Sequence, residues 1–106
     1  MDRIGVLTLI GRTTGKDKYG IDSVTETRTD VYCTLASVST QEMLSASQMG
    51  VSASLRADIY SDEYDGQKIA EYDGKRYRIY RTYQSRKYQD RTELYLEERA
   101  GDVATE

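Results

Sequence analysis

The sequence has no tryptophan, phenylalanine, proline or histidine, and it has a single cysteine, Cys33. Without histidine, the commonest general base and metal ligand near neutral pH is missing, and a lone cysteine excludes an internal disulfide. The longest apolar run, IGVLTLIG at residues 4–11, is too short to span a bilayer and lacks a signal-peptide cleavage pattern. We therefore expect a soluble, unexported protein that is not an enzyme, binds no cofactor or metal and has no membrane segment.

The aromatic content consists entirely of tyrosine. Ten tyrosines in 106 residues must supply much of the apolar area of the core while their hydroxyls remain hydrated or hydrogen-bonded. A chain of this length folds as one domain with a modest core, which oligomerisation often supplements. We expect a single domain over residues 1–106 that associates with other subunits.

Alternation of apolar and polar residues predicts most of the strands. In VSASLRADIY, Val51, Ala53, Leu55, Ala57 and Ile59 share one face. The same test predicts strands at residues 4–10, 29–38, 51–60, 67–72, 75–84 and 91–99, with Val31, Cys33, Leu35, Tyr77, Ile79, Leu94 and Leu96 facing inward. The fold class is therefore mainly β, a small six- to seven-stranded barrel or sandwich with one short helix or loop insertion.

Residues 39–50, STQEMLSASQMG, interrupt this β pattern. Ser39 and Glu42 have the spacing of a capping box, and Gly50 offers a left-handed stop. The predicted helix has a thin apolar face, so it packs either on its own sheet or on a partner or channel.

Two segments have no strand or helix pattern. Residues 11–28 are polar and contain three glycines, which predicts a long loop or a flexible hairpin tip. Residues 100–106 are predicted to be a flexible tail.

No motif indicates catalysis or metal binding. GRTTGKD at residues 11–17 has one residue too few between its glycines for a phosphate-binding loop, and Asp17 stands where serine or threonine is needed. The carboxylates of DEYDG at residues 62–66 lack the alternation and the closing glutamate of a calcium loop. Cys33 lies on an apolar strand face and is interpreted as an inert core thiol.

Charge is segregated along the second half of the chain. Residues 58–73 hold six acids and one base, residues 75–91 hold seven bases and one acid, and residues 92–106 hold five acids and one base. A solvated hairpin of mixed charge explains this order. The alternative is self-complementarity, in which the basic hairpin of one subunit faces the acidic segment of its neighbour in a head-to-tail ring.

The stretch YDGKRYRIYRTYQ at residues 72–84 interleaves bases and aromatics, as single-stranded nucleic-acid-binding surfaces do. Asp73-Gly74 is also a tight-turn signal, which favours a β-hairpin. Simple alternation separates Tyr80 from Tyr77 and Tyr83, so it predicts no continuous stacking platform. An oligonucleotide-binding type of barrel that binds single-stranded nucleic acid remains the alternative interpretation.

The order of elements carries a resemblance. A capped helix ending in QMG, an alternating strand, an acidic loop, IAEYDGKRYRIYRTYQ and a final TELYLEER follow one another. Over residues 30–99 this order resembles the head-closure, or head-tail connector, proteins of long-tailed bacteriophages. Tyr72, Gly74, Tyr77 and Ile79 occupy the hairpin pattern Y-x-G-x-x-Y-x-I that is typical of that family.

The resemblance implies a structural virion protein, encoded by a phage or prophage and assembled in the cytoplasm of the bacterial host. It implies a homo-oligomeric ring, built from subunits that can be monomeric alone, between portal and adaptor proteins above and a tail protein below. Phage DNA would pass through the channel without sequence-specific binding.

Two sets of candidate site residues follow. The segment expected to obstruct or release DNA in the channel is Gln41, Glu42, Met43, Leu44, Ser45, Ser47, Gln48 and Met49. The expected subunit or partner interface pairs the basic hairpin with the acidic segment and comprises Arg76, Arg78, Tyr80, Arg81, Asp62, Glu63 and Asp65.

Overall fold

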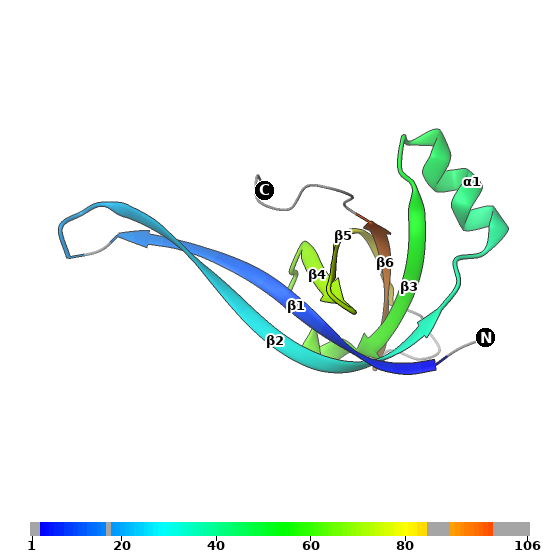
Figure 1. Ribbon diagram of the computed structural model, residues 1–106, viewed down its shortest axis with the longest axis horizontal. Coiled ribbons are helices and arrows are strands. Elements are labelled where there is room, and N and C mark those ends of the chain that lie inside the picture. Colours follow the sequence, from blue (N-terminus) through cyan, green and yellow to red (C-terminus); the bar gives the residue numbers. More distant parts are fainter. Residues whose placement is uncertain (1–2, 17, 85–89, 99–106) are drawn as a thin grey trace.

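The computed structural model describes residues 3–16, 18–84 and 90–98. Its elements are β1 (Arg3–Lys16), β2 (Asp22–Ala36), α1 (Thr40–Gln48), β3 (Ala53–Tyr60), the 3₁₀ turn η1 (Ser61–Glu63), β4 (Ile69–Tyr72), β5 (Lys75–Gln84) and β6 (Arg91–Glu98). The strands form a closed antiparallel barrel in the order β1-β2-β3-β6-β5-β4 (Figure 1). The prediction of a mainly β protein with a small barrel and one short helix is confirmed, and the predicted tail at 100–106 lies outside the described residues.

Side chains fill the inside of the barrel. Every inward position predicted from alternation in β2, β5 and β6 belongs to one buried cluster, which consists of Leu7, Leu9, Val31, Cys33, Leu35, Ala57, Ile59, Ala70, Tyr77, Ile79, Leu94 and Leu96. Burial raises the pKa of the Cys33 thiol, which suits an inert core residue. The barrel is therefore a packed core and not a pore.

The prediction of a loop over residues 11–28 is wrong for most of that range. β1 continues to Lys16 and β2 begins at Asp22, and the two strands pair in one unbroken register from Arg3↔Leu35 to Lys16↔Asp22. The end of this hairpin projects far from the barrel (Figure 1). We call residues 11–28 the arm. The segment is a hairpin tip, as the second part of the prediction had it, but most of its length is regular strand.

The arm lacks apolar alternation because it has no core to face. The face that continues the barrel interior bears only small side chains, namely Gly11, Thr13, Gly15, Ser23, Thr25 and Thr27. The opposite face carries cross-strand ion pairs, Arg12 with Glu26 at 3.8 Å and Lys16 with Asp22 at 2.7 Å. Pairing of this kind stabilises a ribbon without apolar burial, and apolar periodicity cannot reveal it.

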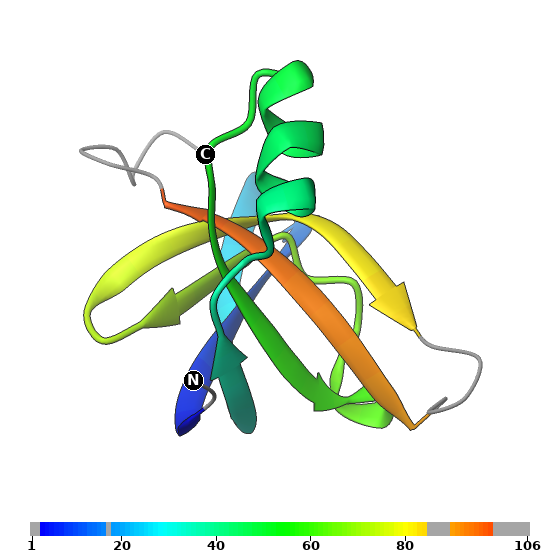
Figure 2. The same cartoon turned by 90° about the vertical axis from the view of Figure 1, so that its right-hand side faces the viewer.

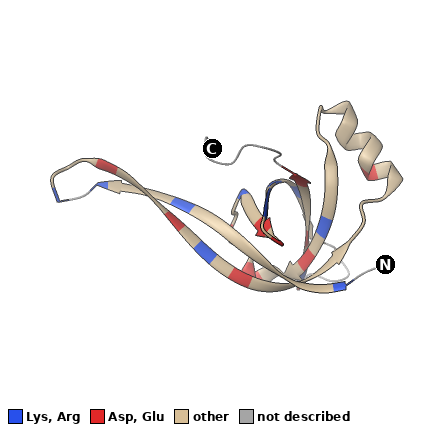
Figure 3. Cartoon of the chain, in the orientation of Figure 1, with Lys and Arg blue, Asp and Glu red and all other residues tan. Residues whose placement is uncertain are grey.

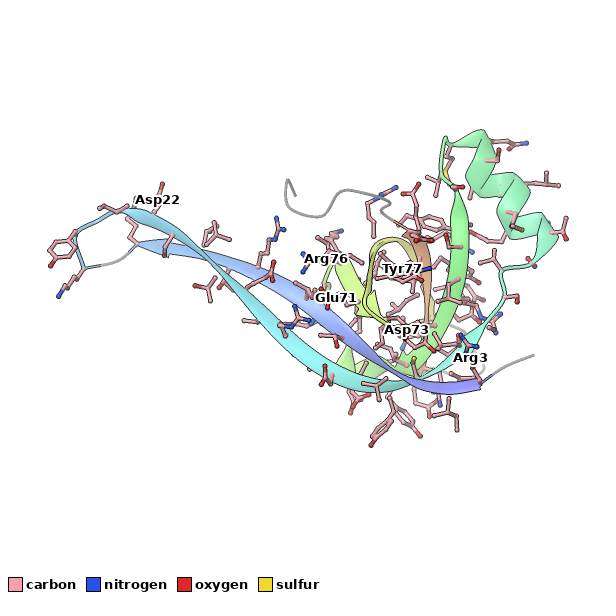
Figure 4. All side chains as sticks on the ribbon, viewed as in Figure 1. Arg3, Asp22, Glu71, Asp73, Arg76 and Tyr77 are labelled. Atoms are coloured by element: carbon pink, nitrogen blue, oxygen red, sulfur yellow. The ribbon has the colours of Figure 1, made fainter. Side chains whose placement is uncertain are left out.

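An ion-pair network braces the root of the arm against the barrel. Glu71 of β4 accepts hydrogen bonds from Arg28 of β2 and from Arg76 of β5, at 2.5 and 2.9 Å. Figure 4 shows Glu71 and Arg76 side by side at the root of the arm. Arg76 also lies 3.6 Å from the carboxylate of Glu26. The Arg28 and Arg76 guanidinium groups hold the pKa of Glu71 below its ordinary value. Because three strands meet at Glu71, the network ties the direction of the arm to the barrel.

The predicted turn at Asp73-Gly74 joins β4 to β5. Asp73 has φ 54° and Gly74 has φ 77°, so both residues are in the left-handed region that a tight hairpin requires. Gly15, by contrast, lies in β1 with ordinary backbone geometry, and a Cβ built there would meet no atom within 4 Å.

We predict that Gly74→Ala lowers the free energy of unfolding by about 1 kcal/mol, because a Cβ strains the left-handed backbone. Gly15→Ala is the matched control, since it removes the same chain entropy from the unfolded state without strain in the fold. Urea denaturation of the two variants measures the difference. Equal stability of both variants would contradict the turn geometry.

Candidate functional site: a helix anchored by one carboxylate

The helix α1 forms where the sequence predicted it. The Ser39 hydroxyl accepts from the Glu42 backbone N–H at 3.1 Å, which satisfies one of the amides at the start of the helix. At the other end Gly50 has φ 77°, and the N–H groups of Gly50 and Val51 donate to the carbonyls of Ser47 and Ala46 at 3.0 and 2.9 Å. This is a Schellman stop, which defines the helix as a unit.

Little apolar surface holds this helix to the rest of the chain. Ala46 is its one buried residue, whereas Met43, Leu44 and the capping Met49 are 50%, 62% and 63% exposed. The helix stands away from the barrel, alongside β3 (Figures 1 and 2). The other predicted channel residues on this helix are polar and exposed, namely Gln41, Ser45, Ser47 and Gln48.

Glu42 anchors α1 to β5. Its carboxylate accepts hydrogen bonds from the Arg81 Nη2 at 2.6 Å and Nε at 3.3 Å, and from the Tyr80 hydroxyl at 2.9 Å. The Glu42 side chain is 13% exposed and that of Arg81 is 39% exposed. The hydrogen bonds from Arg81 lower the pKa of Glu42, while burial and the bond to Glu42 raise the pKa of Tyr80. A capping box also needs the Glu42 carboxylate to accept from the backbone N–H of Ser39. This part of the prediction is wrong, because the Glu42 carboxylate turns to β5.

A β-bulge explains how two neighbouring residues reach the same carboxylate. Ile79 pairs with Leu96, but the next pair is Arg81 with Tyr95, so Tyr80 is the extra residue. A bulge breaks the alternation of side chains and lets Tyr80 and Arg81 both face α1. Simple alternation predicted that Tyr80 and Tyr83 lie on opposite faces of β5. This detail is wrong, because the bulge reverses the alternation after Ile79 and both side chains lie on the outer face.

Tyr95 of β6 packs against Arg81 and Tyr80, the two residues that bind Glu42. The guanidinium of Arg81 lies 4.2 Å from the Tyr95 ring centroid, and the rings of Tyr80 and Tyr95 are 6.3 Å apart and tilted by 58°. The Tyr95 hydroxyl donates to Glu93 at 2.6 Å, and burial together with this bond raises the pKa of Tyr95 to about 12. Cation–π and ring contacts of this kind fix Arg81 and Tyr80 in position for Glu42.

Members of the two predicted residue sets, Glu42 of one and Tyr80 and Arg81 of the other, meet at this anchor within one chain. The basic residues of the interface set contact acids of the same chain: Arg76 contacts Glu71, Arg78 contacts Glu97 at 2.8 Å, and Arg81 contacts Glu42. The acidic members, Asp62, Glu63 and Asp65, lie exposed in η1 and the loop after it. The charge complementarity that suggested an intersubunit contact is therefore met within the chain for these arginines.

Sequence reasoning missed the residues that complete these contacts. No local pattern assigns Glu71, Glu97 or Tyr95 to a site, because each is an ordinary strand residue. Only the strand pairing brings them to the arginines. The block order acid, base, acid was the available signal, since an antiparallel meander places a basic strand between two acidic ones.

Comparison with models of known protein families finds no match, and no curated protein matches the chain. Among the described residues no group of three or more histidine, cysteine, aspartate or glutamate side chains could hold a metal ion. No helix in the same part of the chain is long and apolar enough to cross a membrane.

We predict that Glu42→Gln loosens α1 without unfolding the barrel. Loss of the charged hydrogen bonds removes about 1 kcal/mol from a partly exposed anchor, so the α1 amides should exchange with deuterium about fivefold faster. Glu63→Gln is the matched control, an exposed acid-to-amide change in η1. Unchanged exchange of α1 in Glu42→Gln, or equal acceleration in both variants, would show that the carboxylate does not hold the helix.

Proposed function

We propose that the chain is a structural virion protein of a long-tailed bacteriophage, encoded by a phage or a prophage. It forms a ring in the head-tail connector below the portal and its adaptor, closes the head after DNA packaging and offers the attachment site for the tail. The protein is assembled in the bacterial cytoplasm and remains in the virion. The order of elements over residues 30–99, which resembles the head-closure proteins, supports this proposal.

The observation that carries the proposal is the weak anchorage of α1. A closure element must block DNA in one state and move aside in another, so its free energy of docking must be small. α1 meets this requirement because one carboxylate and one buried alanine hold it, while its methionines and Leu44 are exposed. Capping at both ends lets it move as a unit.

The composition of α1 suits a surface that DNA slides past. Residues 39–50 contain no lysine or arginine, so the segment offers no ammonium or guanidinium group to the phosphate backbone. The filled core means that DNA would pass through the centre of a ring of subunits and not through a barrel. The proposed channel segment is still Gln41, Glu42, Met43, Leu44, Ser45, Ser47, Gln48 and Met49, of which Glu42 holds the docked helix to β5.

Deletion of residues 41–48 should leave the barrel folded, because Ala36 of β2 and Arg56 of β3 are paired neighbours and the residues that remain can join them. We predict that heads assembled with this variant incorporate the protein but leak their DNA. The measurement is the DNA content of purified heads, with incorporation of the variant confirmed in the same particles. Full DNA retention would assign α1 to packing only, and absence of the wild-type chain from particles would overturn the connector proposal.

The alternative function, binding of single-stranded nucleic acid, is less well supported. Acidic and basic residues alternate over the molecule (Figure 3), and the arginines of β5 contact carboxylates. A guanidinium group that is already paired gains little from a phosphate. Tyr80, which a stacking surface would need, donates to Glu42 and packs near Tyr95.

We predict that the chain binds labelled single-stranded DNA only weakly at low salt, with a dissociation constant no tighter than the range of about 10⁻⁴–10⁻⁶ M that is typical of non-specific binding. Fluorescence anisotropy measures this affinity directly. Submicromolar binding that weakens steeply with added salt would favour the alternative over the connector.

A further inference from the structure

Two apolar clusters lie at opposite ends of the β1–β2 ribbon. The side patch consists of Ile4, Val6 and Tyr32, which are 80%, 46% and 74% exposed. Val6 and Tyr32 are directly opposed, and Ile4 lies two residues from Val6 on the same outer face. The arm tip consists of Tyr19, Ile21 and Val24, which are 74%, 62% and 65% exposed. Contiguous apolar patches on a protein surface are typical of interaction sites.

The two clusters cannot meet within one molecule. Val6 and Lys16 are ten positions apart on one strand, which corresponds to about 33 Å along an extended ribbon. The whole molecule is 51 Å long, and the ribbon runs along this direction (Figure 1). A contact between the arm tip and the side patch must therefore join two molecules.

The side patch contains a shallow depression. A depression of about 210 Å³ lies among Val6, Asp30, Val31 and Tyr32. This is several times the volume of about 30 Å³ that one water occupies in the liquid, so the edge of an aromatic ring can rest in the depression. At the arm tip Tyr19 is the exposed aromatic residue, which makes it the natural occupant.

Charge favours the arm tip of a second copy over other occupants. The ammonium group of Lys18 lies 5.2 Å from the centroid of the Tyr19 ring. Asp30 lines the depression, and its carboxylate accepts a hydrogen bond from Thr8 at 2.7 Å. A Tyr19 ring seated in the depression brings Lys18 to Asp30, whereas a contact between two arm tips would bring two copies of Lys18 together.

We infer that the arm tip of one subunit docks on the side patch of the next, with Tyr19 in the depression and Lys18 at Asp30. The contact joins two different surfaces, so one subunit can place its tip on one neighbour and receive the tip of another on its patch. Such contacts generate rings when the rotation closes. The inference rests on the proposed function for the place of the ring, but the contact itself belongs to the isolated chain.

The test uses the full chain in solution and two variants changed only at exposed residues. Tyr19→Ser/Ile21→Ser removes the tip, and Val6→Ser/Tyr32→Ser removes the patch. Sedimentation velocity from micromolar to near-millimolar protein should show concentration-dependent association of the wild type and at least tenfold weaker association of either variant. Tyr60→Ser/Tyr83→Ser is the control, since these side chains are 51% and 49% exposed outside both clusters.

Mixing the two variants distinguishes this contact from a tip-to-tip or a patch-to-patch contact. The tip variant has an intact patch and the patch variant has an intact tip, so the mixture should form heterodimers and nothing larger. A wild type that stays monomeric over the whole range overturns the inference. So does a tip or patch variant that associates like the wild type, or a mixture that stays monomeric.

A charge exchange tests the proposed pairing. Lys18→Asp and Asp30→Lys should each weaken association several-fold, and the double variant should regain it. Equal association in all four proteins would overturn the placement of Lys18. Because these measurements need no phage particle, failure of the contact is distinguishable from failure of the connector proposal, which is read from DNA retention in heads.

Discussion

The structure depends on one mismatch in length: the β1–β2 ribbon is longer than the barrel that it helps to close. β4 joins β1 only at Thr8–Ile10, and β3 joins β2 only at Thr34–Ala36. These short pairings complete a barrel of six strands, in which strand number and stagger are linked. Among the described residues, the rest of the ribbon pairs with no further strand, and it projects from the barrel. Both the direction of the arm and the exposure of the apolar residues at its tip follow from this geometry.

The same barrel converts charge that is segregated in sequence into charge that is paired in space. β5 carries Arg76, Arg78 and Arg81, and its neighbours β4 and β6 supply Glu71 and Glu97. Arg81 lies beyond the bulge, where the alternation has reversed, and contacts Glu42 of α1. The basic hairpin is therefore the middle of an intramolecular ladder. In the proposed ring, contacts between subunits would therefore use surfaces where exposure, rather than net charge, is the dominant feature.

Alternation predicted the parts of the fold that bury side chains and failed where nothing is buried. The strands that carry Leu7, Val31, Leu94 and the other core residues have one buried face and one solvent-exposed face. Alternation with period two therefore predicted these strands. In the arm both faces are exposed to solvent. Its regular structure comes from the pairing of β1 with β2, which runs along the whole ribbon without a shift in register. The helix was predictable because Ser39 and Gly50 define its ends locally. Its anchor was not, because the bulge at Tyr80 depends on the pairing with β6.

The two projections, the arm and α1, differ in how the barrel holds them. Glu71 joins Arg28 and Arg76 at the root of the arm, so three strands restrain its direction, and rotation of the arm would break several ion pairs together. α1 depends on a single carboxylate, and its release would cost one group of hydrogen bonds and little apolar burial. Elements that move in binding and gating come from the least stable parts of a fold. In the proposed connector, a braced arm suits a fixed contact between subunits, while a helix on one anchor suits the part proposed to move.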